Sequence, residues 1–386
     1  MIRMKVFKMK KAQIKSLLWV MHISWIIAMC IVVITGGVQH DYTFYLAQWR
    51  LAFSSPAIWV SNAYGPIHVI LAYACVFGSL GPKIIMCSTF LIIDSFLFSR
   101  LLKLNMEDNN AILIYILSIT FNGLLIFDGF WYGLNDIFVA SFVLAAILAR
   151  FDRKFVLMGV LMGVAALIKY YPMLLLLFLI FDERCIRLRP LLAAISVFTL
   201  GIVFSWVLVG NSILSSIYVG FSRPPKLLSI LSPLQKHPWI IGGQGIVNFL
   251  IDHNSIILVC VAGIAFLLFW YYGLSWLSSL AAGTLAIFIT YKIGHPQFYL
   301  PWLTSIAALP LLSNKHDIRT AWICMPFVVF LSVFQTIYSL GTKMHGSWQI
   351  VRDNVGFLVF PLGVLTIYFV VRQHHDLPNR TFYLKW

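Results

Sequence analysis

An acidic residue stands just beyond the first long apolar segment of the chain. Asp41 follows the apolar run that ends at Gly36-Gly37, and His40 precedes it directly. An ionisable group at the end of a hydrophobic span is costly unless it faces water, a partner or a substrate. A carboxylate in this place can accept a proton from an incoming hydroxyl, which accelerates a reaction by roughly 10² to 10⁴. We therefore predict Asp41 as a catalytic base and His40 as a substrate-binding residue; a solvated acid that ends a helix is the alternative.

A second polar cluster lies around the start of a later apolar segment. Asn135 and Asp136 open that segment, and Asp128 ends the segment before it. Two acids and an amide around one loop suit the hydroxyl groups of a sugar, so we predict Asn135 and Asp136 as substrate-binding residues. Asp136 at the beginning of a helix is also favoured by the helix macrodipole, which is the structural alternative.

Lysine and histidine also occur at the ends of apolar runs. Lys169 either extends to the membrane surface or meets an anionic headgroup. His295 lies between Gly294 and a proline. From that position it can donate a hydrogen bond to a phosphate or orient a sugar, although a lone interfacial histidine is often structural. We predict His295 as the second catalytic residue, with Lys292 and Gln297 beside it in substrate binding.

Further basic residues occur in loops where the overall charge pattern predicts few of them. Arg223, Lys343 and Arg352 are the examples that we assign to substrate binding. They can bind a phosphate leaving group or attract anionic lipid. The sequence has no HExxH motif, no paired histidine and carboxylate spacing and no glycine-rich phosphate loop, and its six cysteines are scattered without a CxxC pair. We therefore expect no metal, no cofactor and no disulfide framework.

The composition is that of a polytopic membrane protein. Of the 386 residues, 61% are hydrophobic and 11% are charged, with a mean hydropathy of +0.89. A soluble protein carries about 25% charged residues. The net charge of +15 reflects basic residues that gather next to predicted spans, beginning with residues 1–15, and this distribution argues against nucleic acid. The first span is too long for a signal-peptide core and lacks a small-x-small site, so we expect it to remain as an anchor.

Long apolar runs predict about twelve membrane-spanning helices, because about 20 residues at 1.5 Å rise cross the hydrocarbon. The predicted spans are near residues 16–37, 84–102, 110–127, 135–150, 155–169, 172–182, 190–209, 254–271, 274–291, 297–312, 319–340 and 354–371. The sixth is short, which is tolerated where a helix lines a protein-walled cavity.

Residues 64–80 are apolar enough to cross, yet they begin Tyr-Gly-Pro. If this segment lies along the outer surface, most of the 28 Lys and Arg residues fall on the cytoplasmic side. The positive-inside rule therefore favours a re-entrant or juxtamembrane segment.

We predict one all-α integral membrane domain over residues 1–386, with both termini in the cytoplasm. Residues 1–15 form the basic N-terminus, residues 38–82 form the first outer loop with juxtamembrane helices, and residues 372–386 form the tail. A transporter or flippase of lipid-linked sugars is one alternative, but it predicts inverted repeats, which we do not find. An O-antigen polymerase or ligase is another, and it predicts one large late outer loop.

Several of these residues resemble the GT-C glycosyltransferases: the acid beyond the first span, the Tyr64-Gly65-Pro66 start of an outer helix, and the block Gly133-Leu134-Asn135-Asp136. Residues 159–172, GVLMGVAALIKYYP, are similar to the "aGlllGlaaliKpyP" stretch of polyprenol-phosphate-mannose-dependent mannosyltransferases, which form glycosyltransferase family 87 and relatives. The resemblance is specific over residues 130–172 and moderate over 36–66 and 291–302. Two departures are the missing Gln of the commoner Gly-Gln-Asn/Asp block and Tyr-Gly-Pro in place of Tyr-Pro-Pro.

The resemblance implies an inverting transfer of a hexose, usually mannose, from a polyprenyl-phosphate carrier to a hydroxyl of a glycolipid or glycan acceptor. It implies catalysis at the extracytoplasmic face, and we expect this to be the plasma (inner) membrane. We further expect the protein to be a monomer in contact with membrane lipid. Carried over by position, Asp41 matches the general base, His295 the histidine near the donor phosphate, and Lys169 the basic residue of the Lys-Pro motif. Tyr64 joins the substrate-binding residues on the same basis.

Overall fold

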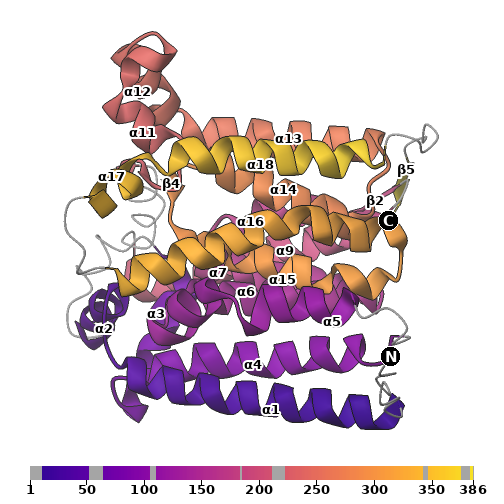
Figure 1. Cartoon of the computed structure of the whole chain (residues 1–386). Coiled ribbons are helices and arrows are strands. Elements are labelled where there is room, and N and C mark those ends of the chain that lie inside the picture. Colours follow the sequence, from indigo (N-terminus) through magenta and orange to yellow (C-terminus); the bar gives the residue numbers. More distant parts are fainter. Residues whose placement is uncertain are drawn as a thin grey trace, which may run out of the picture.

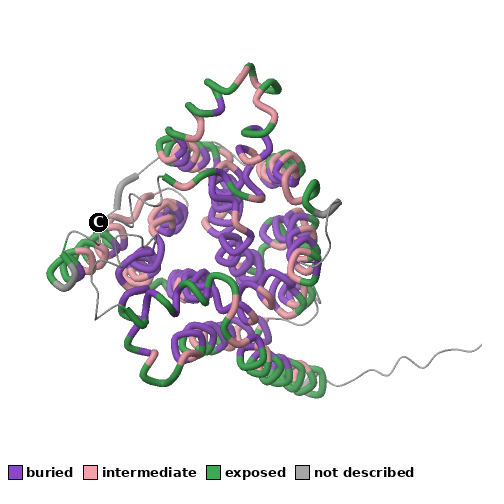
Figure 2. Tube along the Cα trace, turned by 90° about the vertical axis from the view of Figure 1, so that its left-hand side faces the viewer, coloured by how far each residue is buried: buried purple, intermediate pink, exposed green. Residues whose placement is uncertain are grey.

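The structure, a computed structural model, consists of helices that lie side by side along one general direction (Figure 1). It describes residues 11–51, 64–104, 110–182, 185–210, 222–341, 347–374 and 383–385. The predicted substrate-binding residue Lys343 lies outside the described residues. Buried residues occupy the centre of the helix assembly and exposed residues its periphery (Figure 2).

Five helices of the described chain are long and apolar enough to cross a membrane. They are α1 (Lys11–Gly36), α4 (Gly81–Leu101), α9 (Leu188–Val209), α13 (Asn254–Tyr271) and α16 (Lys315–Leu340). A sixth span results if α5 (Asn110–Tyr115) with η3 (Ile116–Thr120) and η4 (Leu125–Trp131) are taken together, with a bend of 51°. The chain is therefore an integral membrane protein. Exposed apolar side chains on α1, such as Ile27, Ile31 and Ile34, suit contact with lipid.

The remaining predicted spans coincide with helices that are shorter than a bilayer requires. They are α6 (Asp136–Phe151), α7 (Phe155–Ile168), α8 (Pro172–Leu179), α14 (Trp276–Thr290), α15 (Leu300–Ala308) with η8 (Leu309–Leu312), and α18 (Gly356–Arg372). Nearly every residue of α6, α14 and α15 is buried. A helix enclosed by protein need not match the hydrocarbon thickness. Helix length by itself therefore shows five or six of the about twelve predicted spans.

Residues 64–80 form a short bent segment, α3 (Pro66–Ile70) followed by the 3₁₀ helix η2 (Leu71–Phe77). With a rise of about 1.5–2 Å per residue, this segment is shorter than the hydrocarbon thickness of about 30 Å. It packs across the end of α7, where the Gly65 backbone N–H donates to the Ile168 carbonyl at 2.9 Å. The segment is thus too short to cross as a helix, and its predicted location at the outer surface remains a prediction.

The two ends of the helix assembly carry different connecting elements (Figure 1). One end, which we call the α2 end, carries α2 (Asp41–Leu51), α17 (Ser347–Asn354) and an excursion beyond the helices. The excursion comprises α11 (Leu231–Lys236), η6 (Pro238–Ile241) and α12 (Gln244–Asp252). The other end, the terminal end, carries the start of α1 and the end of α18.

Two small sheets tie the connections together. At the α2 end, β3 (Lys226–Leu227) pairs in parallel with β4 (Ile293–Gly294), which leads into η7 (Pro296–Tyr299). At the terminal end, β1 (Phe181–Asp182), β2 (Cys185–Arg187) and β5 (Tyr383–Lys385) form a three-stranded sheet in the order β1-β2-β5. The start of α1 and the end of α18 lie at the same end of the helix assembly (Figure 1).

Candidate active site

A cavity of about 100 Å³ at the α2 end brings together residues from distant parts of the chain. Asp41 and His295, the two predicted catalytic residues, both line it, and so do His40 and Gln297. The complete lining is His40, Asp41, Asp128, Tyr132, Leu134, Leu227, His295, Pro296, Gln297, Gln335 and Tyr338. Two carboxylates, two imidazoles and two amides therefore surround one small polar space.

Asp41 owes its position to the packing of the helix that it opens. Helix α2 buries Tyr42, Tyr45 and Trp49, which recur at helical spacing on one face. The Trp49 indole N–H donates to the His68 carbonyl at 2.7 Å, which fixes α2 against α3. Asp41 itself is exposed at the first turn, where the helix macrodipole favours a negative charge. The helix is thus held by aromatic packing while its carboxylate stays free to meet a substrate.

A buried lysine connects the segment before α2 to the end of η4. Lys83 is 0% exposed, and its ammonium donates to the Trp131 carbonyl at 2.6 Å and to the Gly37 carbonyl at 3.1 Å. Next to this connection the His40 ring lies 4.1 Å from the Tyr132 ring, centroid to centroid. Lys83 therefore positions the turn that carries Asp41. The sequence reasoning did not include it, although a lysine in the first turn of an apolar span was a usable signal.

The second carboxylate of the cavity is held by a side-chain amide from α16. Asp128 accepts a hydrogen bond from the Gln335 side chain at 2.5 Å, and its backbone carbonyl accepts from the Leu134 N–H at 3.0 Å. Asp128 lies in η4, a π-helical segment, and such segments occur frequently at functional sites. Asp128 was noticed in the sequence only as part of a polar cluster, and Gln335 was missed. A polar residue within the apolar run of α16 was the available signal.

The β3–β4 pair holds His295 against the cavity. The Lys226 N–H donates to the Lys292 carbonyl at 3.0 Å, and the Leu228 N–H donates to the Gly294 carbonyl at 2.9 Å. A Cβ atom on Gly294 would lie 2.1 Å from the Ser229 backbone nitrogen, so this close pairing requires glycine. The glycine before His295 is therefore part of the site's construction.

Burial lowers the pKa of the His295 imidazole to about 4. Burial is the largest cause of this lowering; the Asp41 carboxylate opposes it, and the positive charges of Lys169, Arg223 and Lys226 add to it. The imidazole is consequently neutral near pH 7, able to donate a hydrogen bond through one nitrogen and accept through the other. Arg223, whose charge contributes to this lowering, is half-buried and does not line the cavity.

Asp136 and Lys169 form a buried ion pair instead of lining the cavity. The Lys169 ammonium lies 2.5 Å from Asp136 Oδ2, with side-chain exposures of 7% and 0% for the lysine and the aspartate. The Tyr171 hydroxyl donates to Asp136 Oδ1 at 3.3 Å, and the ammonium lies 4.6 Å from the Phe298 ring centroid. Lys169 thus pairs inside the protein and does not extend to the membrane surface.

Tyr64 and Asn135 pack behind the cavity. Asn135 is 0% exposed and accepts a hydrogen bond from the Tyr45 hydroxyl at 3.4 Å. The Tyr64 ring contacts the Tyr45 ring edge-on, with 5.0 Å between centroids. The Lys169 ammonium lies 5.3 Å from the centroid of the Tyr64 ring. Burial raises the pKa of Tyr64 to about 12, so the phenol stays protonated. Both residues join α2 to the Asp136–Lys169 pair.

The remaining predicted residues lie at the same end without lining the cavity. The Lys292 ammonium donates to the Ile251 carbonyl at 3.3 Å, which directs it toward α12. Arg352 is half-buried on α17. Among the described residues, no group of three or more His, Cys, Asp or Glu side chains is arranged to hold a metal ion.

A membrane-embedded helical protein with acids, a neutral imidazole and nearby cations around one polar cavity has the features of a membrane transferase. The family model of glycosyltransferase family 87 matches residues 84–290. The chain therefore belongs to glycosyltransferase family 87, a GT-C family, and is an enzyme. None of the curated proteins matches the sequence. Family membership favours a glycosyltransferase, with a sugar donor and an acceptor, over the transporter and polymerase alternatives.

Proposed function

We propose that this enzyme transfers a hexose, with mannose as the expected sugar, from a polyprenyl-phosphate carrier to a hydroxyl of a glycolipid or glycan acceptor. The observation that carries the proposal is the shared cavity of Asp41 and His295. Both residues lie outside the segment that the family model matches, so their roles rest on this geometry.

Asp41 acts as the general base. Its carboxylate accepts the proton of the acceptor hydroxyl while the hydroxyl oxygen attacks the anomeric carbon. The new glycosidic C–O bond forms as the bond between the anomeric carbon and the phosphate oxygen breaks. Attack from the face opposite the phosphate inverts the anomeric configuration. An exposed carboxylate at the start of a fixed helix suits this role, because it is accessible and held in place.

His295 and the cations beside it stabilise the departing phosphate. The neutral imidazole donates one hydrogen bond to a phosphate oxygen, and Arg223 and Lys226 contribute positive charge. Stabilisation of developing charge by positioned donors is usually the largest contribution to catalysis. Because the carrier phosphate is itself the activated leaving group, the enzyme needs no nucleotide-binding motif.

The α2 end faces the extracytoplasmic side of the plasma membrane in this proposal, and the terminal end faces the cytoplasm. The helices α6, α7, α8, α14, α15 and α18 complete about twelve crossings together with the longer spans. The basic residues of the terminal end support this orientation under the positive-inside rule.

The test is a transfer assay with the full chain in nanodiscs and a panel of polyprenyl-phosphate hexoses, with nucleotide sugars as controls. We expect transfer from a polyprenyl-phosphate hexose and a product whose anomeric configuration, measured by NMR, is inverted relative to the donor. Transfer from a nucleotide sugar alone, or retention of configuration, would overturn the proposal.

A further inference from the structure

The excursion at the α2 end projects sideways from the helix assembly. In Figure 1, α11 and α12 lie beyond α13, across the general direction of the long helices. In Figure 2, which views the assembly along that direction, the excursion extends past the outline of the other helices. Because the long helices cross the membrane along their own direction, the excursion reaches out in the plane of the membrane, over the lipid that surrounds α13.

The junction between α12 and α13 lies at the boundary of the hydrocarbon. Helix α13 is one of the helices apolar enough to cross a membrane. Its 18 residues rise about 27 Å, and the hydrocarbon is about 30 Å thick, so both ends of α13 lie at a membrane surface. Helix α12 ends at Asp252, directly before α13. The excursion is therefore at the level of the membrane surface.

Helix α12 has an apolar side that the protein leaves uncovered. Val247 is 0% exposed in a small core formed with α11. Ile246 and Phe249, which lie one turn apart, are 49% and 57% exposed. The polar side of the helix carries Gln244, whose side-chain amide donates to the Asn248 side-chain oxygen at 2.8 Å. An exposed apolar side next to a polar side is typical of a helix that lies on a membrane surface.

The uncovered side of α12 continues onto the exposed surface of α13. The His253 ring, at the junction of the two helices, stacks on the Phe249 ring with 4.3 Å between centroids. Ile256 and Val259 follow at helical spacing and are 64% and 59% exposed. Since α13 crosses the membrane, this part of its surface contacts lipid. The same lipid is within reach of the apolar side of α12.

The 3₁₀ helix η6 adds two more exposed apolar side chains to the excursion. Trp239 is 76% exposed and Ile240 is 45% exposed. Tryptophan is enriched at the level of the lipid headgroups, where its ring meets both apolar chains and water. Helix η6 thus suits the same surface as α12.

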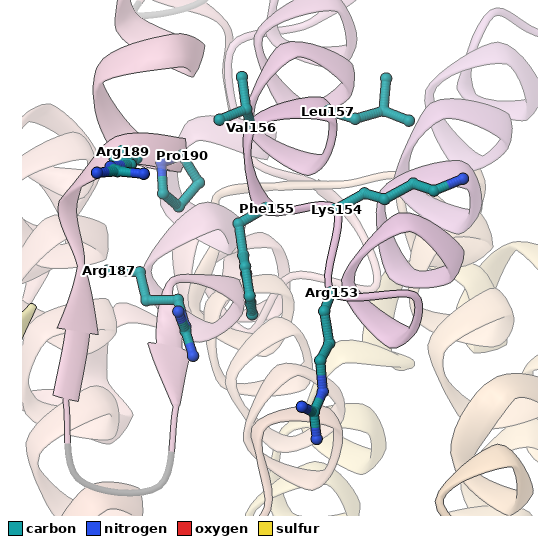
Figure 3. Close-up of a pocket in the computed structure, with 8 residues that line it drawn as sticks. All are labelled: Arg153, Lys154, Phe155, Val156, Leu157, Arg187, Arg189 and Pro190. Atoms are coloured by element: carbon teal, nitrogen blue, oxygen red, sulfur yellow. The ribbon is translucent and has the colours of Figure 1, made fainter. Parts of the chain in front are cut away.

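The excursion carries few charges, in contrast to the terminal end. Lys236 and Asp252 are the charged residues of 231–252, and Lys236 pairs with Asp353 of α17 at 2.5 Å. At the terminal end, basic residues gather around a cavity of about 420 Å³ near the start of α7 (Figure 3): Arg153, Lys154, Arg187 and Arg189. Contact between the excursion and lipid would therefore depend on apolar burial rather than on attraction to anionic headgroups.

The excursion is joined to both strands beside the candidate active site. It follows β3, whose Leu227 lines the cavity. At its other end, the Asn254 side chain donates to the Thr290 carbonyl and accepts from the Lys292 N–H, both at 2.9 Å. Lys292 directly precedes β4, which leads to His295. The depth of the excursion in the membrane thus sets the depth of these two strands.

We propose that the excursion is an anchor on the membrane surface at the α2 end. Ile246 and Phe249 of α12 enter the boundary between headgroups and acyl chains, and Trp239 of η6 lies among the headgroups. The partner is the lipid surface, without selection of one headgroup, because the contact is apolar. The anchor holds β3 and β4 at the level of the lipid headgroups. The proposal does not depend on the reaction that the enzyme catalyses.

The experiment places the photoreactive amino acid p-benzoylphenylalanine at single positions of the full chain, reconstituted in liposomes of phosphatidylcholine or of phosphatidylglycerol. Phe249 is the test position, and Val259 on α13 is the comparison in contact with lipid. Asn248, exposed on the polar side of α12, is the matched control. After illumination, mass spectrometry of the intact protein measures lipid adducts, and electrophoresis detects two crosslinked copies of the chain.

We expect a yield of lipid adducts at Phe249 within about twofold of that at Val259 and about tenfold above that at Asn248, because only the apolar side meets acyl chains. The yield should be equal in the two lipids. A yield at Phe249 as low as at Asn248, adducts in phosphatidylglycerol alone, or crosslinking of two copies through Phe249 would each overturn the proposal. Ile246, on the same side of α12, is the test position if the variant at Phe249 does not fold.

Discussion

Asp41 and His295 line the same cavity, although one opens the first short helix after α1 and the other follows a strand late in the chain. The cavity also contains Asp128, held by Gln335. A carboxylate opposite a neutral imidazole provides a proton acceptor and a hydrogen-bond donor in one space. This is the pair of functions that displacement of a phosphate by a hydroxyl requires.

Replacing His295 should slow transfer without preventing insertion. His295→Ala removes a donor from the departing phosphate, and the loss of one such donor costs about 10² to 10³ in turnover. His295→Gln keeps a donor and should retain more activity. His253→Ala, which changes an exposed histidine at the α2 end outside the cavity, is the control. Unchanged turnover in His295→Ala would make this histidine a bystander.

The pH dependence follows from the lowered pKa of His295. Burial lowers this pKa from 6.5 to about 4, so the neutral form persists down to about pH 5. The unfolded chain binds the proton more readily than the folded protein, so His295 makes stability fall as pH drops from 6.5 toward 4. A pH–rate profile of turnover should therefore show no ionisation of His295 near pH 6.5. A loss centred near 6.5 that disappears in His295→Gln would contradict this prediction.

The Asp136–Lys169 pair should contribute mainly to stability. Breaking a buried pair by removing one partner leaves an uncompensated charge and costs about 3–5 kcal/mol. Asp136→Asn and Lys169→Met should each lower the thermal unfolding temperature, and the double variant should be more stable than either single variant. If the single variants unfold like the original protein while KM for the donor rises, the two residues bind substrate instead.

Some residues of the candidate site could be predicted from the sequence, because a charged or polar side chain next to an apolar run is costly to bury. An acid or a histidine at the end of an apolar run is expensive, and this signal singled out Asp41 and His295, which line the same cavity. The sequence did not show which of these residues contact one another, because the contacts join segments that are far apart in the chain. Lys169 looked equally suited to the surface or to a headgroup, and only the packing of α7 against α6 shows that it pairs with Asp136.

The helices themselves were well placed by hydrophobicity, since every predicted span coincides with a helix of the structure. The lengths of the helices were not predicted well. An apolar run indicates that a helix avoids water, but it does not show whether lipid or protein surrounds that helix. Helix α15 covers Leu300–Ala308 within the span predicted over residues 297–312, and all nine of its residues are buried. Enclosed helices such as α6, α14 and α15 account for part of the difference between about twelve predicted spans and the five or six supported by length, whereas α18 is short although much of it is exposed.

The orientation of the molecule can be tested with single cysteines. Lys103 lies in the exposed turn after α4, and Trp239 is 76% exposed on the excursion at the α2 end. In sealed cells, Lys103→Cys should react with a membrane-impermeant maleimide only after permeabilisation, and Trp239→Cys should react without it. The six native cysteines require a parallel sample without added cysteine as the control. Labelling of Lys103→Cys from outside would refute the proposed orientation.

The central claim is that the Asp41 carboxylate is the base, and the turnover of Asp41→Asn tests it most directly. Because Asp41 is exposed, the variant should unfold at the original temperature while turnover at saturating donor falls by about 10² to 10⁴. Asp252→Asn, which changes an exposed acid at the same end outside the cavity, should keep full activity. If Asp41→Asn turns over at the original rate, the proposed mechanism is wrong.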